Sequence, residues 1–141
     1  MTEDMTLTFH TVSFSTAHLV WHCPYVCVFS ASDGKVNGAN YREHLLLRLD
    51  GENWGDDAHT ENSVTVEKTA DFGTWDAWKE KNKEGYDCTV TIHREKDRVV
   101  METENQGISL HSETVIRNGA KDLYVALTGD QCVITNIRVK R

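Results

Sequence analysis

Apolar side chains recur at every second position along most of the chain, which is the period of a strand that buries one face. The alternation is most regular where Cys88, Val90 and Ile92 are separated by polar residues. The dipeptide Lys96-Asp97 then allows a tight turn into another strand. Runs of apolar, β-branched and aromatic residues predict the remaining strands. These runs cover residues 6–14, 25–30, 41–49, 62–67, 98–103, 108–116, 123–127 and 132–139.

Two segments depart from this regular alternation. The apolar positions change phase halfway through residues 6–14, which predicts a β-bulge or two short strands there. Residues 74–83 combine good helix formers with a candidate N-cap at Thr74, and Gly85 lies on the C-cap side. We therefore expect one short helix among about eight or nine short strands.

Many short strands, glycine turns and a single proline are typical of an antiparallel β-sandwich. The predicted fold class is therefore all-β, a jelly-roll sandwich with one short helix. At 141 residues the chain has the size of one domain, and no linker rich in Pro, Gly or Ser divides it. We expect residues 1–141 to form a single domain.

The composition narrows the classes of partner. The apolar fraction of 39% and the charged fraction of 26% are ordinary for a globular protein, and no membrane-spanning run is present. The net charge is -7, and basic residues cluster only at Arg138–Arg141, so binding to nucleic acid or to an anionic membrane is disfavoured. A neutral polysaccharide is indifferent to this charge. We expect a monomer.

Localisation and redox state are only weakly constrained. The N-terminal residues 1–5 are acidic and are not followed by the apolar run of a signal peptide. Secreted modules are often handled without their signal, so an extracellular location stays open. The four cysteines, Cys23, Cys27, Cys88 and Cys132, lie in apolar or alternating stretches, which favours buried free thiols over disulfides.

Specific catalytic motifs are absent from the sequence. There is no Gly-x-Ser-x-Gly elbow, no phosphate-binding glycine loop and no His-Glu-x-x-His pair. Zinc is disfavoured because His22 and Cys23, with Cys27 nearby, would point to opposite faces of a strand. Carboxylates such as Glu43, Glu102 and Glu104 keep open the alternative of a glycoside hydrolase or lyase.

The loop from Asp50 to Asp57 gathers oxygen donors of the kind that calcium requires. Its spacing does not match an EF-hand loop, and an acidic turn exposed to water is the simpler interpretation. We therefore expect no cofactor, with a structural calcium ion as the minor alternative.

Four tryptophans in this short chain carry the positive argument for function. A sugar ring presents an apolar C–H face that stacks on a flat aromatic ring, while its hydroxyls bond to polar side chains. Trp54 lies in a polar loop flanked by glycine, and Trp21 lies at the start of a strand, so both are expected to be exposed. Trp75 and Trp78 share one helix face, and Trp75 is the one expected in the core. The predicted ligand-binding residues are Trp21, Trp54, Trp78, Tyr41, Gln106 and Arg42.

The residues also resemble a known class of domain. The segment Tyr41-Arg-Glu-His-Leu-Leu-Leu-Arg-Leu-Asp-Gly-Glu-Asn-Trp-Gly-Asp-Asp57, followed by Phe72-Gly-Thr-Trp-Asp-Ala-Trp78 and a hairpin, is similar to jelly-roll accessory domains of polysaccharide-degrading enzymes from anaerobic gut and rumen bacteria. The resemblance implies an extracellular, non-catalytic module. Such a module binds a β-glycan such as xyloglucan, β-glucan or xylan and holds it close to an attached catalytic domain.

The sequence thus predicts a non-catalytic carbohydrate-binding module. Its partners would be a plant cell-wall polysaccharide and the larger carbohydrate-active enzyme of which it forms part. Two alternatives remain open. The first is a glycoside hydrolase or lyase built on a sandwich, and the second is a sandwich that binds another protein through an apolar patch.

Overall fold

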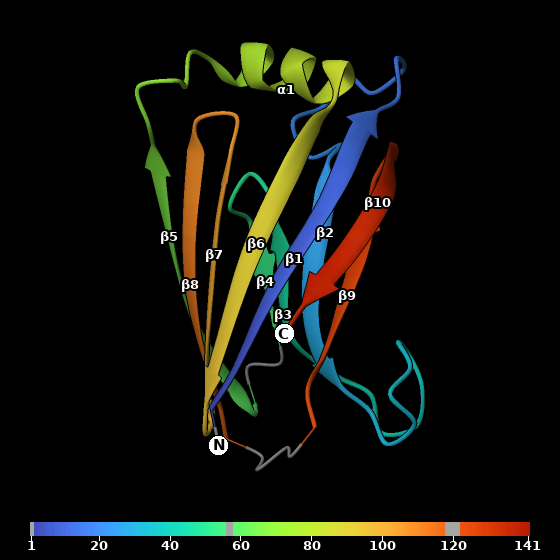
Figure 1. The fold of residues 1–141 in the computed structure, drawn as a ribbon, viewed down its shortest axis with the longest axis vertical. Coiled ribbons are helices and arrows are strands. Elements are labelled where there is room, and N and C mark those ends of the chain that lie inside the picture. The colour runs from blue at the N-terminus through green and yellow to red at the C-terminus, as the bar shows by residue number, and fades with distance from the viewer. Residues whose placement is uncertain (1, 56–57, 118–121) are drawn as a thin grey trace.

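Two antiparallel sheets packed face to face form the body of the protein, and one helix crosses an end of the sandwich (Figure 1). The computed structural model describes residues 2–55, 58–117 and 122–141. The larger sheet has the strand order β10-β1-β6-β7-β8-β5 and the smaller sheet the order β4-β3-β2-β9. The predicted all-β sandwich with one short helix is confirmed.

The strands of the larger sheet are β1 (Thr2–Ser13), β5 (Thr60–Lys68), β6 (Tyr86–Glu95), β7 (Arg98–Asn105), β8 (Ile108–Ile116) and β10 (Cys132–Lys140). Those of the smaller sheet are β2 (Pro24–Ser30), β3 (Arg42–Arg48), β4 (Asn53–Trp54) and β9 (Tyr124–Gly129).

The core lies between the two sheets and is filled by alternate side chains from both. The smaller sheet contributes Val26 and Val28 from β2 and Leu45 and Leu47 from β3, and the larger sheet contributes inward residues of β1, β6, β7 and β8. Because successive side chains of a strand point to opposite faces, the residues between these core positions lie on the outer faces of the sandwich.

The irregularity predicted in residues 6–14 is present in the pairing of β1 with β10, whose register shifts between Thr8 and His10, but the alternation of β1 itself does not change phase. Strand β1 keeps one alternation throughout, and its inward positions continue from Leu7 and Phe9 to Thr11 and Ser13, which are also buried. Two of the inward positions of β1 are therefore polar, which is why its apolar residues alone change phase. The irregularity belongs to the partner strand β10, where the register with β1 shifts and Asn136 has a φ of 53°.

Helix α1 (Trp75–Glu84) forms where the sequence predicted a helix, and it closes one end of the core. The Thr74 hydroxyl accepts a hydrogen bond from the amide of Ala77 at 3.0 Å, which satisfies one of the free N–H groups at the helix start. The indole of Trp78 is 1% exposed and its Nε1 donates to the side-chain oxygen of Asn105 at 3.1 Å. The Asn105 amide in turn donates to the carbonyl of Leu49 at 3.0 Å. One chain of hydrogen bonds therefore joins the helix to both sheets.

We expect Trp78→Phe to lower the free energy of unfolding by about 2 kcal/mol, because the buried Asn105 oxygen loses its donor and the core loses ring volume. The matched control is Trp54→Phe, which alters a ring that is 45% exposed and should change stability by about 0.5 kcal/mol or less. Urea denaturation of the three proteins measures both values. Equal destabilisation by the two substitutions would contradict this account of the helix.

Candidate functional site

Four side chains gather on the outer face of the smaller sheet: Trp21, Tyr25, Arg48 and Trp54, here called the aromatic cluster. Tyr25 on β2 lies directly opposite Arg48 on β3, and opposed residues of an antiparallel pair share one face. Trp54 on β4 is opposite Leu46, two residues before Arg48 on the same face. Three strands thus bring the cluster together, and Trp21 joins it from the loop that precedes β2.

The rings of the aromatic cluster surround the guanidinium group of Arg48. Its Cζ atom lies 6.0 Å from the centroid of the Trp21 ring and 5.6 Å from that of the Trp54 ring, within the range of cation–π contacts. The rings of Tyr25 and Trp54 are nearly parallel, with an interplanar angle of 19° and centroids 6.2 Å apart. Trp21 and Trp54 remain 43% and 45% exposed, so large aromatic surfaces face the solvent.

An ion pair fixes Arg48 in this position. Its Nε donates to Asp50 Oδ1 at 2.7 Å, and the two side chains are only 12% and 7% exposed. Burial alone would lower the pKa of Arg48, but its hydrogen bonds to Asp50 and Tyr25 raise that pKa above the ordinary value. The guanidinium is therefore permanently charged and locally neutralised. The centre of the cluster presents no net charge to a ligand.

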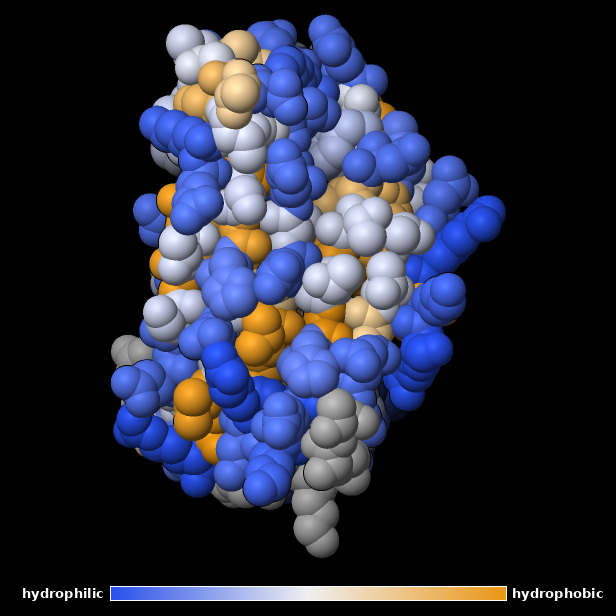
Figure 2. Space-filling model, turned by 60° about the vertical axis from the view of Figure 1, so that its left-hand side comes forward, coloured by the Kyte–Doolittle hydropathy of each residue, from blue (hydrophilic) through white to orange (hydrophobic). Residues whose placement is uncertain are grey.

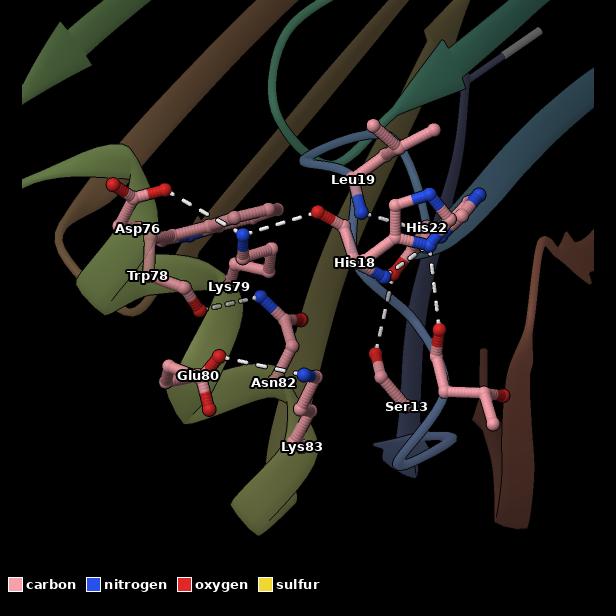
Figure 3. A network of polar contacts seen from close by, with 11 residues as sticks. Ser13, His18, Leu19, His22, Asp76, Trp78, Lys79, Glu80, Asn82 and Lys83 are labelled. Atoms are coloured by element: carbon pink, nitrogen blue, oxygen red, sulfur yellow. Dashed lines mark hydrogen bonds and ion pairs between the residues drawn. The ribbon is translucent and has the colours of Figure 1, made fainter.

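A polar network around His22 holds the loop that carries Trp21 (Figure 3). His22 is buried, and its Nδ1 accepts from the amides of His18 and Leu19 at 3.3 and 3.4 Å. Its carbonyl accepts from the Ser13 hydroxyl at 3.2 Å. From the helix, Lys79 Nζ donates to the carbonyl of His18 at 3.0 Å. The loop is thus tied to β1 and to α1 on either side of Trp21.

A second aromatic group occupies the other end of the same outer face. The ring of Phe29 on β2 packs against Tyr124 on β9 and against Tyr41, with ring centroids 5.5 Å apart in both contacts. The Tyr41 hydroxyl donates to Glu43 at 3.1 Å. Phe29 is 3% exposed, whereas Tyr41 and Tyr124 are half-buried. The outer face thus carries aromatic rings along the length of β2, with the exposed ones at the helix end.

Of the predicted site residues, Trp21, Trp54 and Tyr41 lie on this outer face. Trp78 does not, and the prediction that it contacts ligand is wrong because its ring is buried under helix α1 and bonded to Asn105. Sequence spacing placed both helical tryptophans on one side. It could not show which ring faces the interior, and Trp75 is the half-buried one.

Arg42 and Gln106 also lie apart from the aromatic cluster. Arg42 is at the opposite end of β3 from Arg48, and its Nη1 lies 2.7 Å from His59 Nδ1. Gln106 occupies the β7–β8 turn with a φ of 50° and borders a shallow hollow with Lys81 of the helix. The structure therefore does not bring these two polar residues to the exposed tryptophans.

Sequence reasoning missed Tyr25 and Arg48. A signal for Tyr25 was present in β2, where Tyr25, Cys27 and Phe29 alternate with the core residues Val26 and Val28. The larger sheet covers only one face of the smaller sheet. A strand of the smaller sheet that is apolar on both faces therefore indicates that its outer face is also covered or binds a ligand. No comparable signal marked Arg48, because its position depends on the pairing of β3 with β2.

Of the carboxylates considered for hydrolysis, Glu102 and Glu104 line one hollow on the outer face of the larger sheet, whereas Glu43 lies on the other sheet. Glu43 pairs with Phe29 on the outer face of the smaller sheet, whereas Glu102 is exposed between the inward residues Met101 and Thr103 of the larger sheet. Glu43 and Glu102 therefore lie on opposite sides of the sandwich, and they cannot act on one glycosidic bond.

Neither segment considered for metal binding brings a full set of ligands together within the described residues. In the part of the chain that the structure describes, no group of three or more His, Cys, Asp or Glu side chains could hold a metal ion. In the proposed calcium loop, Asp50 is committed to Arg48, and Asp56 and Asp57 lie outside the described residues. Near the considered zinc cluster, Cys23 is buried in the core and Cys27 contacts the Tyr41 hydroxyl on the outer face.

Other hollows offer weaker candidates for a site. A pocket of about 480 Å³ opens at the end of the sandwich opposite the helix, with core residues such as Ile92 and Val99 as its floor and charges of both signs at its rim. Tyr124 contributes an aromatic ring to its lining, but that ring is half-buried and stacked on Phe29, whereas the two indoles of the aromatic cluster are exposed. On the side where β5 lies, hydrophilic side chains predominate and hydrophobic ones form separate patches (Figure 2).

Comparison of the chain with protein-family models, with curated proteins and with solved structures finds no match. Among the described residues, no helix is long and apolar enough to cross a membrane. The geometry of the outer face is therefore the basis for a functional conclusion.

The four cysteines are free thiols, and their environment makes stability depend on pH. Burial raises the pKa of Cys27 and of Cys88 from 9.0 to about 11. Between these values the unfolded chain loses protons that the folded chain keeps, so the free energy of unfolding should fall as the pH rises. We expect a decrease of at most about 1.4 kcal/mol per pH unit for each thiol.

Urea denaturation at pH 8, 9 and 10 under reducing conditions measures this dependence. Cys27→Ala and Cys88→Ala should each reduce the slope above pH 9. An unchanged slope in both variants would show that these thiols do not control alkaline stability.

Proposed function

We propose that the chain is a non-catalytic carbohydrate-binding module that uses the outer face of its smaller sheet. The observation that carries the proposal is the pair of exposed indoles, Trp21 and Trp54, held on either side of Arg48 and beside Tyr25. Exposed aromatic rings at fixed positions are what stacking on sugar rings requires.

The chemistry of the cluster favours a neutral glycan over a charged one. Arg48 is neutralised by Asp50 and carries no spare charge for an anionic group. Hydroxyl groups of a sugar would find the Tyr25 hydroxyl and the guanidinium N–H groups at the margin of the rings. A neutral β-glycan such as xyloglucan, β-glucan or xylan meets these conditions and is compatible with the net charge of -7.

Preformed geometry supports binding of an extended ligand. The rings are fixed by strand pairing, by the Arg48–Asp50 pair and by the His22 network, so little conformational entropy is lost when a ligand binds. The half-buried rings of Tyr41 and Tyr124, which pack on the buried Phe29, extend the aromatic surface along β2 by about 13 Å at the usual rise per residue. This length suits a chain of several sugars.

The biological setting belongs to the same proposal. A module that only binds polysaccharide is useful when it concentrates a catalytic partner on the substrate. We therefore place it in a larger, extracellular carbohydrate-active enzyme that acts on plant cell walls, with the module supplying adhesion.

Trp54→Ala should weaken binding of the preferred glycan by about 5- to 150-fold, if a sugar stacks as strongly as a nucleobase does, at about 1–3 kcal/mol per ring. Trp21→Ala should have a similar effect. Gln106→Asn is the control, since it alters a polar residue at the β7–β8 turn and should leave the affinity unchanged.

Affinity electrophoresis against soluble glucans, xylans and mannans identifies the ligand, and calorimetry then gives the dissociation constants. The proposal fails if no glycan retards the protein. It also fails if the two tryptophan variants bind as tightly as the control.

A further inference from the structure

A second concave surface begins at Trp54, at one edge of the sandwich. It is a pocket of about 450 Å³ between the edge strand β4 of the smaller sheet and the edge strand β5 of the larger one. Trp54 belongs both to this pocket and to the aromatic cluster. The remaining side chains of its wall are Asn53, Thr60, Glu61, Asn62 and Arg117.

The floor of the pocket is rigid. The Asn62 amide donates to the carbonyl of His44 at 2.8 Å, and its oxygen accepts from the Thr114 hydroxyl at 2.6 Å. Gly55 lies next to the hydrogen bond between Asn62 and His44. A Cβ atom on Gly55 would come within 2.3 Å of the Asn62 amide nitrogen and 2.5 Å of the His44 carbonyl oxygen. Only glycine leaves this space open, so the two sheet edges stay at a fixed separation and the hollow is preformed.

The rim of the pocket offers groups that suit hydroxyls. Arg117 Nη2 and Glu61 Oε2 form an ion pair at 2.6 Å, and both side chains are more than half exposed. This pair uses one guanidinium nitrogen and one carboxylate oxygen, which leaves further donors and one oxygen for a ligand. Because the two charges compensate each other, the rim favours a neutral polar ligand over an ionic one. The volume is at the scale of a small-molecule site.

We propose that this pocket receives a single-sugar branch of a decorated glycan whose main chain stacks on the aromatic cluster. The inference rests on the proposed function, because the main chain must first lie on Trp54 for a branch to reach over the edge of β4. It assigns Glu61 and Arg117 to recognition of the branch, and it makes decorated β-glycans the preferred class of ligand.

Calorimetry with matched oligosaccharides tests the inference. One pair is cellotetraose with and without xylosyl branches, and the other is xylotetraose with and without an arabinosyl branch. In one of the two pairs, we expect the decorated oligosaccharide to bind about tenfold more tightly than the undecorated one. One or two added hydrogen bonds supply a difference in affinity of this size. The double variant Glu61→Ala/Arg117→Ala should abolish this preference and leave binding of the undecorated member unchanged.

The double variant Arg98→Ala/Glu113→Ala is the matched control. It removes another exposed ion pair between neighbouring strands, on the outer face of the larger sheet, and should keep the preference for the branch. Circular dichroism checks that both variants fold.

The outcomes separate the two proposals. Equal affinity for decorated and undecorated members of both pairs would overturn the branch pocket and leave the proposed function intact. The same holds if a preference persists in the Glu61→Ala/Arg117→Ala variant. Absence of binding to all four oligosaccharides and to every glycan of the electrophoresis panel would overturn the proposed function, and the branch pocket with it.

Discussion

The chain of hydrogen bonds from Trp78 through Asn105 to Leu49 constrains the rest of the structure. Its three members come from the helix, the larger sheet and the end of β3, and all of them are buried. Buried polar groups without a partner are costly, so any displacement of the helix or of either sheet at this end would break a bond that water cannot replace. The helix end of the sandwich is therefore firmly connected.

The candidate site lies at this same end. Leu49 immediately follows Arg48 and immediately precedes Asp50, so the bond to Asn105 fixes the backbone between the two members of the central ion pair. On the other side, Lys79 of the helix holds the loop that carries Trp21. The exposed rings are therefore held in place by residues that are bonded to the core, as a precise binding surface requires.

Local patterns in the sequence were sufficient for most of the fold and for part of the site. The helix was located correctly because Thr74 and Gly85 act on their neighbours, and the hairpin at Lys96 was located correctly for the same reason. Phase was misjudged in β1, where Thr11 and Ser13 are buried although they are polar. The other failures concern which helical tryptophan faces the core and which residues distant strands bring together, and no local pattern encodes either.

The separation of the tryptophans into two environments has a practical consequence. Trp21 and Trp54 are in contact with water and with a guanidinium group, whereas Trp78 is enclosed by the core. Indole emission shifts to longer wavelength in water and to shorter wavelength in an apolar surrounding. The four tryptophans therefore form two groups of built-in fluorescent reporters: Trp21 and Trp54 sense events at the surface, and Trp78, with the half-buried Trp75 beside it, senses the loss of the interior.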